Sequence, residues 1–142
     1  MERPSVKYLL DTAAWLNGLM MPVALPARIR RLLNETAPKA LCTISLLETA
    51  ILHRLKRLEF EADLEQLFLA GLSADIELLD LSPRIAAATN VLPADFPGDP
   101  FDRTILATAT VLNLTVITAD SAFRDAKVCP VEYYPFKPSR LK

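Results

Sequence analysis

The sequence predicts an α/β protein in which helices cover a central parallel sheet. The first indication is that short continuous apolar runs alternate along the chain with longer segments of helical period. The second is that runs such as Ala40–Ile44 are apolar except for Thr43, which is typical of strands buried on both faces. The third is composition, because 51% hydrophobic residues and only three Gly exclude disordered, collagen-like and low-complexity chains. A length of 142 residues indicates one domain, residues 1–142, with a core of its own.

Two strand-helix pairs are predicted in the first third of the chain. Val6–Leu10 is a short apolar run that stops at Asp11, and Thr12–Met20 continues as a helix. Pro26 opens a short amphipathic helix with its apolar residues on one side. The second strand is Ala40–Ile44, which leads into a further helix.

That further helix is expected to begin with a capping box, because Ser45 and Glu48 have the required spacing, and to run to about Leu58. Residues 59–72 repeat apolar positions at the helical period and predict another helix. Turn residues concentrate in one later segment, which predicts a loop. The remaining elements are expected in this order: a strand at Ile76–Leu81, a helix from Ser82-Pro83 to about Leu92, the loop at Pro93–Pro100, a helix from Phe101 or Asp102 to Asn113, a strand at Thr115–Thr118, an edge strand at Val128–Tyr133, and a loose tail at 135–142.

Charge and cysteine content exclude several classes of protein. Sixteen Lys and Arg against 17 Asp and Glu exclude a polybasic protein that holds nucleic acid by bulk charge. Cys42 and Cys129 lie far apart in apolar stretches, which favours reduced, buried thiols in a cytoplasmic protein over a disulfide framework. Asp11 interrupts the apolar run near the start, and no segment approaches the roughly 20 apolar residues of a membrane span. We therefore expect no membrane association.

Four carboxylates fall at the ends of predicted strands or the starts of helices. They are Asp11, Glu48, Asp102 and Asp120. In an open parallel sheet the ligand crevice lies at the carboxyl ends of the strands, so the four are expected to converge there. Converging carboxylates repel one another unless a cation is present, and a set of oxygen ligands without His or Cys favours Mg²⁺ or Mn²⁺. Such a site predicts hydrolysis of a phosphodiester.

Each acid taken alone has a purely structural interpretation. Asp11 and Glu48 are suited to helix capping, and Asp102 and Asp99 to the helix macrodipole. Asp120 is acceptable as an ordinary turn residue. The convergence of the set, rather than any single member, carries the prediction of a site.

Four segments, in order, carry a resemblance to a known family: Leu9–Ala14 (LLDTAA), Ser45–Glu48 (SLLE), Asp99–Ala109 (DPFDRTILATA) and Leu114–Asp120 (LTVITAD). Together they resemble the PIN domain, and more narrowly the VapC-type ribonuclease toxins of toxin–antitoxin pairs. The resemblance implies a three-layer α/β/α sandwich and a Mg²⁺- or Mn²⁺-dependent endoribonuclease that acts on RNA. It also implies a cognate antitoxin that inhibits the enzyme, and a homodimer.

The resemblance also assigns roles to individual residues. The metal and its water would be held by the three acids Asp11, Glu48 and Asp102 and by a fourth, Asp120. Supporting positions are Thr12 and Thr118, whose hydroxyls lie beside the site, and Asp99 with its partner Arg103. Two departures are Cys42, where the family commonly has Ser, and Ala119, where it frequently has a basic residue.

Several other polar and apolar segments also have ordinary structural interpretations. His53 lies five positions after Glu48, so we expect it on a different, solvated face of the helix and outside the catalytic set. The basic residues around it and those of 28–31 could guide RNA, although such runs usually form solvated helix faces. The apolar stretch from Trp15 to Val23 could be core or could include a partner surface.

Two rival functions stay open on the sequence alone. One is a catalytically idle module that binds RNA or a protein, which the near-neutral charge and Ala119 would allow. The other is an aspartyl-phosphate enzyme with Asp11 as nucleophile, which is disfavoured because Ala13 stands where that chemistry usually has a second acid. Without the four proposed ligands, 13 acids face 16 bases, so the rest of the molecule carries a charge of +3.

Overall fold

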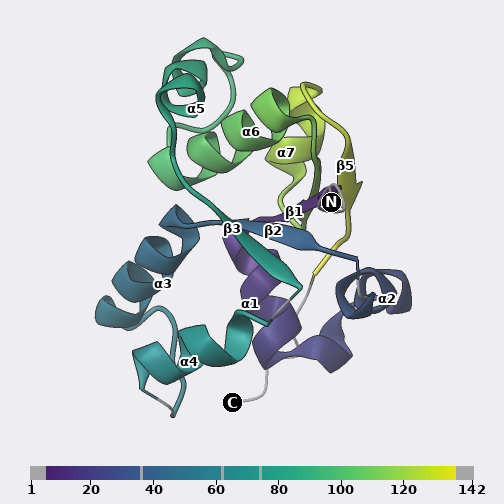
Figure 1. The fold of residues 1–142 in the computed structure, drawn as a ribbon, viewed down its shortest axis with the longest axis vertical. Coiled ribbons are helices and arrows are strands. Elements are labelled where there is room, and N and C mark those ends of the chain that lie inside the picture. The colour runs from purple at the N-terminus through teal and green to yellow at the C-terminus, as the bar shows by residue number, and fades with distance from the viewer. Residues whose placement is uncertain (1–5, 36, 62, 74, 137–142) are drawn as a thin grey trace, which may run out of the picture.

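Five parallel strands form one sheet in the order β3-β2-β1-β4-β5, with helices on both faces (Figure 1). The computed structural model describes residues 6–35, 37–61, 63–73 and 75–136. The strands are β1 (Tyr8–Leu10), β2 (Lys39–Cys42), β3 (Ile76–Leu79), β4 (Thr115–Thr118) and β5 (Val131–Tyr133). The helices are α1 (Thr12–Met20), α2 (Ala27–Asn34), α3 (Ile44–Arg54), α4 (Leu64–Gly71), α5 (Pro83–Ala88), α6 (Pro100–Leu112) and α7 (Ser121–Ala126), with short 3₁₀ turns η1 (Pro22–Ala24) and η2 (Thr89–Val91).

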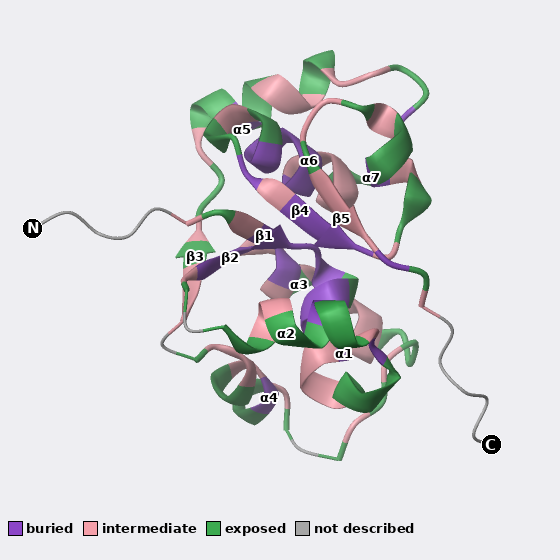
Figure 2. Cartoon of the chain, turned by 90° about the vertical axis from the view of Figure 1, so that its right-hand side faces the viewer, coloured by how far each residue is buried: buried purple, intermediate pink, exposed green. Residues whose placement is uncertain are grey.

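The sheet lies between two layers of helices, as Figure 2 shows with the strands between α5, α6 and α7 on one side and α1 to α4 on the other. Successive strand residues point to opposite faces. Leu9 and Val116 belong to the core beneath α6 and α7, whereas Leu10 and Ile117 belong to the core shared with α1, α2 and α4. The predicted three-layer α/β/α architecture is confirmed.

The strand order places a topological switch point between β1 and β4. From β1 the chain proceeds through β2 to β3 at one edge, and it then returns to add β4 and β5 on the other side of β1. Ligand crevices in open α/β sheets form at such a point, outside the carboxyl ends of the strands. Asp11 follows β1 there, and Thr118 ends the neighbouring β4.

Several predicted element boundaries are confirmed by their local chemistry. The Ser82 hydroxyl accepts a hydrogen bond from the Ile85 amide at 3.1 Å and caps α5. Asn113 ends α6 in the left-handed conformation with φ of 61°, which Asn tolerates better than most residues. Strand β5 lies at the edge of the sheet, as expected.

Three local expectations are wrong. Helix α3 begins at Ile44, and Ser45 lies buried inside its first turn, so Ser45 and Glu48 do not form a capping box. Residues 59–61 and 63 are not helical, because α4 begins only at Leu64, where Asp63 caps it by accepting from the Glu65 amide. Helix α7 was not predicted, because its six residues are too few to show a helical period.

The apolar segment that begins at Trp15 is divided between core and surface. Trp15 is 4% exposed and its indole nitrogen donates to the Gly71 carbonyl at 2.9 Å, whereas Val23 is 86% exposed. Within the ranges described, none of the helices has the length and apolar character needed to span a bilayer. The tail expected from Pro135 lies largely outside the described residues, which end at Phe136.

Candidate active site

The side chain of Asp11, which follows the end of β1, is held in one orientation by two hydrogen bonds. It is 4% exposed, and one carboxylate oxygen accepts the amide of Ala14 at 2.7 Å, which caps α1. The other oxygen accepts the hydroxyl of Thr118 from the neighbouring strand at 2.5 Å. Burial raises the pKa of Asp11 to about 6, although both hydrogen bonds act to lower it.

Thr118 links Asp11 to the next acid along the chain. While its hydroxyl donates to Asp11, the same oxygen accepts the amide of Asp120 at 2.9 Å. Asp120 is exposed and caps α7 through the Ala122 amide at 2.9 Å. Thr118 therefore orients the Asp11 carboxylate through the hydrogen bond that its hydroxyl donates.

Glu48 comes from α3, which follows β2. Strand β2 pairs with β1 on the side away from β4, so Glu48 and Thr118 approach Asp11 from different neighbouring strands. The Thr12 hydroxyl donates to the Ser45 hydroxyl at 2.8 Å and thereby joins the first turns of α1 and α3. Glu48 lies one turn further along α3, on the same helix face as Ser45. Its Oε1 atom is buried and has no hydrogen-bond partner among the described residues, and burial raises the pKa of this carboxyl.

Asp99 and Asp102 occupy the start of α6. One Asp99 oxygen accepts the amides of Phe101 and Asp102 at 2.8 and 3.1 Å, which caps the helix. Asp102 is half-buried in the first turn. Burial, together with the negative charges of Asp99 and Glu48, raises the pKa of Asp102 to about 7, and Asp120 and Asp11 contribute in the same direction.

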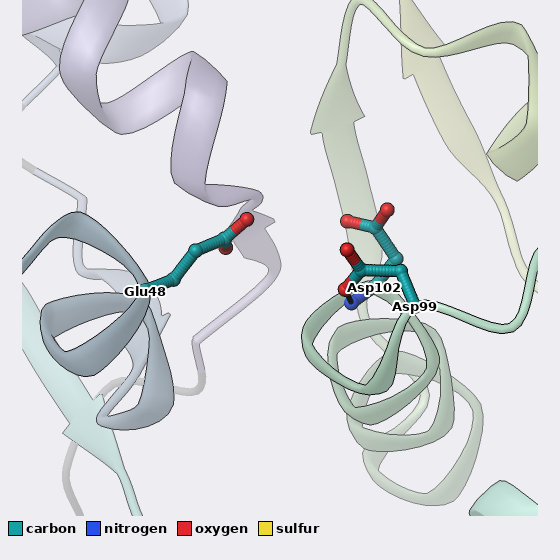
Figure 3. A group of neighbouring side chains, drawn as sticks. All are labelled: Glu48, Asp99 and Asp102. Atoms are coloured by element: carbon teal, nitrogen blue, oxygen red, sulfur yellow. Dashed lines mark hydrogen bonds between the residues drawn. The ribbon is translucent and has the colours of Figure 1, made fainter. Parts of the chain in front are cut away.

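Glu48, Asp99 and Asp102 form the most compact carboxylate group in the described part of the chain. One oxygen from each lies within 4.8 Å of the others. Figure 3 shows Glu48 reaching from α3 toward the two aspartates at the start of α6. Asp11 and Asp120 lie outside this group, yet both interact electrostatically with Asp102. The structure therefore brings all four predicted acids to one edge of the sheet and adds Asp99 to the centre.

The chemistry of this donor set fits a hard divalent cation. All the donors are carboxylate oxygens, which Mg²⁺ and Mn²⁺ prefer, and Glu48 holds a buried oxygen without a hydrogen-bond partner in the described ranges. Burial is the main cause of the raised pKa values of Asp11 and Asp102, and repulsion from the neighbouring carboxylates adds to it. A cation would remove that repulsion.

Arg103 and His53 do not face the carboxylate group. Arg103 donates to the backbone carbonyls of Phe96 and Thr89 at 3.2 and 2.9 Å, so it secures the loop before α6 instead of pairing with Asp99. His53 is half-buried rather than solvated, with Nδ1 3.1 Å from the Leu58 carbonyl.

Sequence reasoning placed two residues of this region incompletely. Ser45 was interpreted as a helix cap, although it is the buried contact of Thr12. Asp99 was expected only as a supporting acid, although it belongs to the compact group. The sequence does contain a signal for both residues. Ser45 and Glu48 are three positions apart, as are Asp99 and Asp102, and this spacing places each pair on one helix face.

The fold and the site together define an α/β protein with a half-buried carboxylate cluster at the switch point of a parallel sheet. The sequence matches the PIN domain family over residues 8–128, and the chain belongs to this family. It is 33% identical over 85 residues to ribonuclease VapC22 of Mycobacterium tuberculosis, a match over 60% of this chain and 65% of that relative.

Solved structures show the same fold. The chain resembles one in the crystal structure of VapBC2 from Rickettsia felis bound to a DNA fragment from their promoter, with a TM-score of 0.70 and 17% identity, covering 91% of this chain and 99% of that one. It also resembles a chain of a toxin–antitoxin complex from Klebsiella pneumoniae, with a TM-score of 0.64 and 20% identity, covering 93% and 100%.

Proposed function

We propose that this protein is a Mg²⁺- or Mn²⁺-dependent endoribonuclease of the VapC type, which hydrolyses RNA phosphodiesters. The single observation that carries the proposal is the buried Oε1 of Glu48, which has no hydrogen-bond partner in the part of the chain that the structure describes and belongs to the same compact group as Asp99 and Asp102. Membership of the PIN domain family and similarity to ribonuclease VapC22 support the same reaction.

The residues divide into holding and positioning roles. Glu48, Asp99 and Asp102 would hold the ion through carboxylate oxygens. Bound there, a divalent ion binds phosphate oxygens and lowers the pKa of a coordinated water. Asp11 would face the same centre, and Thr118 fixes its carboxylate by donating a hydrogen bond. Asp120, tied to Thr118 through its amide, is proposed as the fourth acid of the site.

We propose further that the protein is the toxin of a pair and binds a cognate antitoxin. The support is its similarity to chains from VapBC and toxin–antitoxin complexes. Coexpression with the product of the neighbouring reading frame should yield a complex in which RNA cleavage is suppressed. The homodimer stays a prediction, which light scattering of the purified chain would check.

The activity itself is tested with the purified chain, free of any partner, and a structured RNA. Cleavage should require Mn²⁺ or Mg²⁺ and stop in EDTA. Asp102→Asn should lower the cleavage rate roughly 100-fold, because it weakens the ion site. The matched control is Asp95→Asn, an exposed acid outside the carboxylate group, which should cleave like the parent.

Two outcomes would contradict this mechanism. Cleavage by Asp102→Asn at the parental rate would show that the carboxylate is not needed. Calorimetry that detects no Mn²⁺ binding by the parent, together with RNA binding and no cleavage, would instead favour the idle binding module.

A further inference from the structure

The loop that follows α3 surrounds a surface hollow of about 720 Å³, which we call the 53–61 hollow. It is lined by aromatic and charged side chains, among them His53, Arg54, Lys56 and Phe60. None of these residues belongs to the carboxylate group.

The 53–61 hollow continues toward the carboxylate group along α3. An apolar pocket of about 210 Å³ is lined by Glu48, Leu52 and Leu58, and Leu58 also lines the 53–61 hollow. His53 lies five positions after Glu48 on α3, which corresponds to a rise of about 7.5 Å along the helix axis. A few nucleotides of single-stranded RNA can span this separation.

Two rings in the hollow form a fixed aromatic pair. His53 and Phe60 stack with ring centroids 4.6 Å apart and planes inclined by 25°. The Nδ1 atom of His53 lies 3.1 Å from the Leu58 carbonyl, a contact in which a protonated Nδ1 donates, and Nε2 has no hydrogen-bond partner among the described residues. Unstacked bases of single-stranded RNA bind to aromatic rings of this kind.

Lysine occupies a position in this loop where glycine is favoured. The amide of Lys56 donates to the His53 carbonyl at 3.0 Å, and the amide of Arg57 donates to the Leu52 carbonyl at 2.9 Å. These two bonds form a Schellman motif, whose left-handed residue is usually Gly. Lys56 holds that conformation with φ of 60° despite its side chain.

The cations of this loop are available to an anionic ligand. Arg54, Lys56 and Arg57 are exposed, and none of them forms an ion pair within the described part of the chain. Glu59 and Glu61 also line the hollow and balance the charges of Arg54 and Lys56 there. Arg57, which does not line the hollow, leaves residues 53–61 with a net charge of +1, so the loop combines individual cations with stacking rings instead of acting as a purely basic patch.

We propose that the 53–61 hollow is an RNA subsite in which Phe60 and His53 stack a nucleobase and Lys56 and its neighbouring arginines bind backbone phosphates. The inference rests on the proposed ribonuclease function and extends it, because it assigns substrate binding to a surface beside the carboxylate group. The ligand is a single-stranded segment of RNA.

Lys56→Gly and Lys127→Gly form a matched pair for the test. Lys127 ends α7 and also has a left-handed conformation, with φ of 56°. Both changes remove one positive charge and relieve the same backbone conformation. Each variant should therefore be slightly more stable than the parent, but only Lys56→Gly should bind RNA more weakly.

Affinity is measured by fluorescence anisotropy of a labelled single-stranded oligoribonucleotide, with Ca²⁺ in place of Mg²⁺ and intactness checked on a gel. Lys56→Gly should weaken RNA binding. It should also make the fall of log K, the logarithm of the association constant, with log salt less steep by about 0.7, the value for one lost phosphate contact. Phe60→Leu, which keeps an apolar side chain, should weaken binding about fivefold or more, but should not affect an abasic oligomer.

Equal affinities of Lys56→Gly and Lys127→Gly would overturn the phosphate contact. Loss of affinity by Phe60→Leu for base-bearing and abasic oligomers alike would overturn the stacking role. Poly-L-glutamate is added as a competitor at the same total charge as unlabelled RNA. If it displaces the labelled RNA as effectively as unlabelled RNA does, the hollow is instead a site for an acidic protein segment. RNA cleavage by the parent in Mn²⁺ is scored separately, so failure of the subsite and failure of the nuclease proposal are distinguishable.

Discussion

Asp11→Asn should stabilise the metal-free protein at alkaline pH. Asp11 is buried, and its pKa rises from an ordinary 3.8 to about 6. Asn keeps the contact with Ala14, whose amide its side-chain oxygen can accept, and reverses the contact with Thr118, whose hydroxyl would accept from the side-chain nitrogen. The substitution therefore removes the charge while keeping the shape.

The magnitude and its pH dependence follow from that pKa. Between about pH 4 and pH 6 the folded protein retains a proton on Asp11 that the unfolded chain has lost, so the free energy of unfolding falls as pH rises. Above pH 6 Asp11 is ionised in the folded protein, and its buried charge lowers the free energy of unfolding by about 3 kcal/mol, which corresponds to the rise in its pKa from 3.8 to about 6. Asp11→Asn should gain up to that amount at pH 8, or about 10 °C in Tm, and almost nothing at pH 4.

The assay is urea unfolding followed by circular dichroism in EDTA, at pH 4 and pH 8. The exposed Asp95 supplies the control, since Asp95→Asn should leave stability unchanged at both values. Added Mn²⁺ should stabilise the parent more than Asp11→Asn, because the parent retains the full carboxylate set. If Asp11→Asn is no more stable than the parent at pH 8, the argument from charge burial is refuted.

Three further substitutions test packing and backbone conformation. Gly71→Ala should destabilise the protein by about 1–3 kcal/mol in urea unfolding, because an added Cβ would lie 2.7 Å from the Trp15 ring; an unchanged midpoint would show that the ring moves freely. Lys127→Gly should raise stability by up to about 1 kcal/mol, measured as a higher Tm, since φ of 56° suits glycine; a lower Tm would count against strain there. Arg103→Met should cost about 2–3 kcal/mol and expose the loop before α6 to proteolysis, because the carbonyls that it bonds would lose a donor; protease resistance equal to the parent would contradict that role.

The sequence determined most of the strands and helices, because their apolar periodicity is a local property. It also showed that Asp11 follows a buried strand and that Asp102 lies in the first turn of a helix. Local patterns were insufficient where a distant contact competes or where the pattern is too short. Ser45 has the spacing of a helix cap, but its hydroxyl instead contacts Thr12, 33 residues away, and the six residues of α7 carry too short a pattern to be recognised.

Only the tertiary structure decided how the acids meet. Asp11 and Thr118 are 107 residues apart and bond because β4 pairs with β1, an order that no local segment encodes. The Oε1 atom of Glu48 is buried without a hydrogen-bond partner among the described residues because of the elements packed around α3, and Asp99 lies beside it at the start of α6. Residue type and periodicity are properties of short segments, whereas desolvation and charge proximity arise only when distant segments pack together.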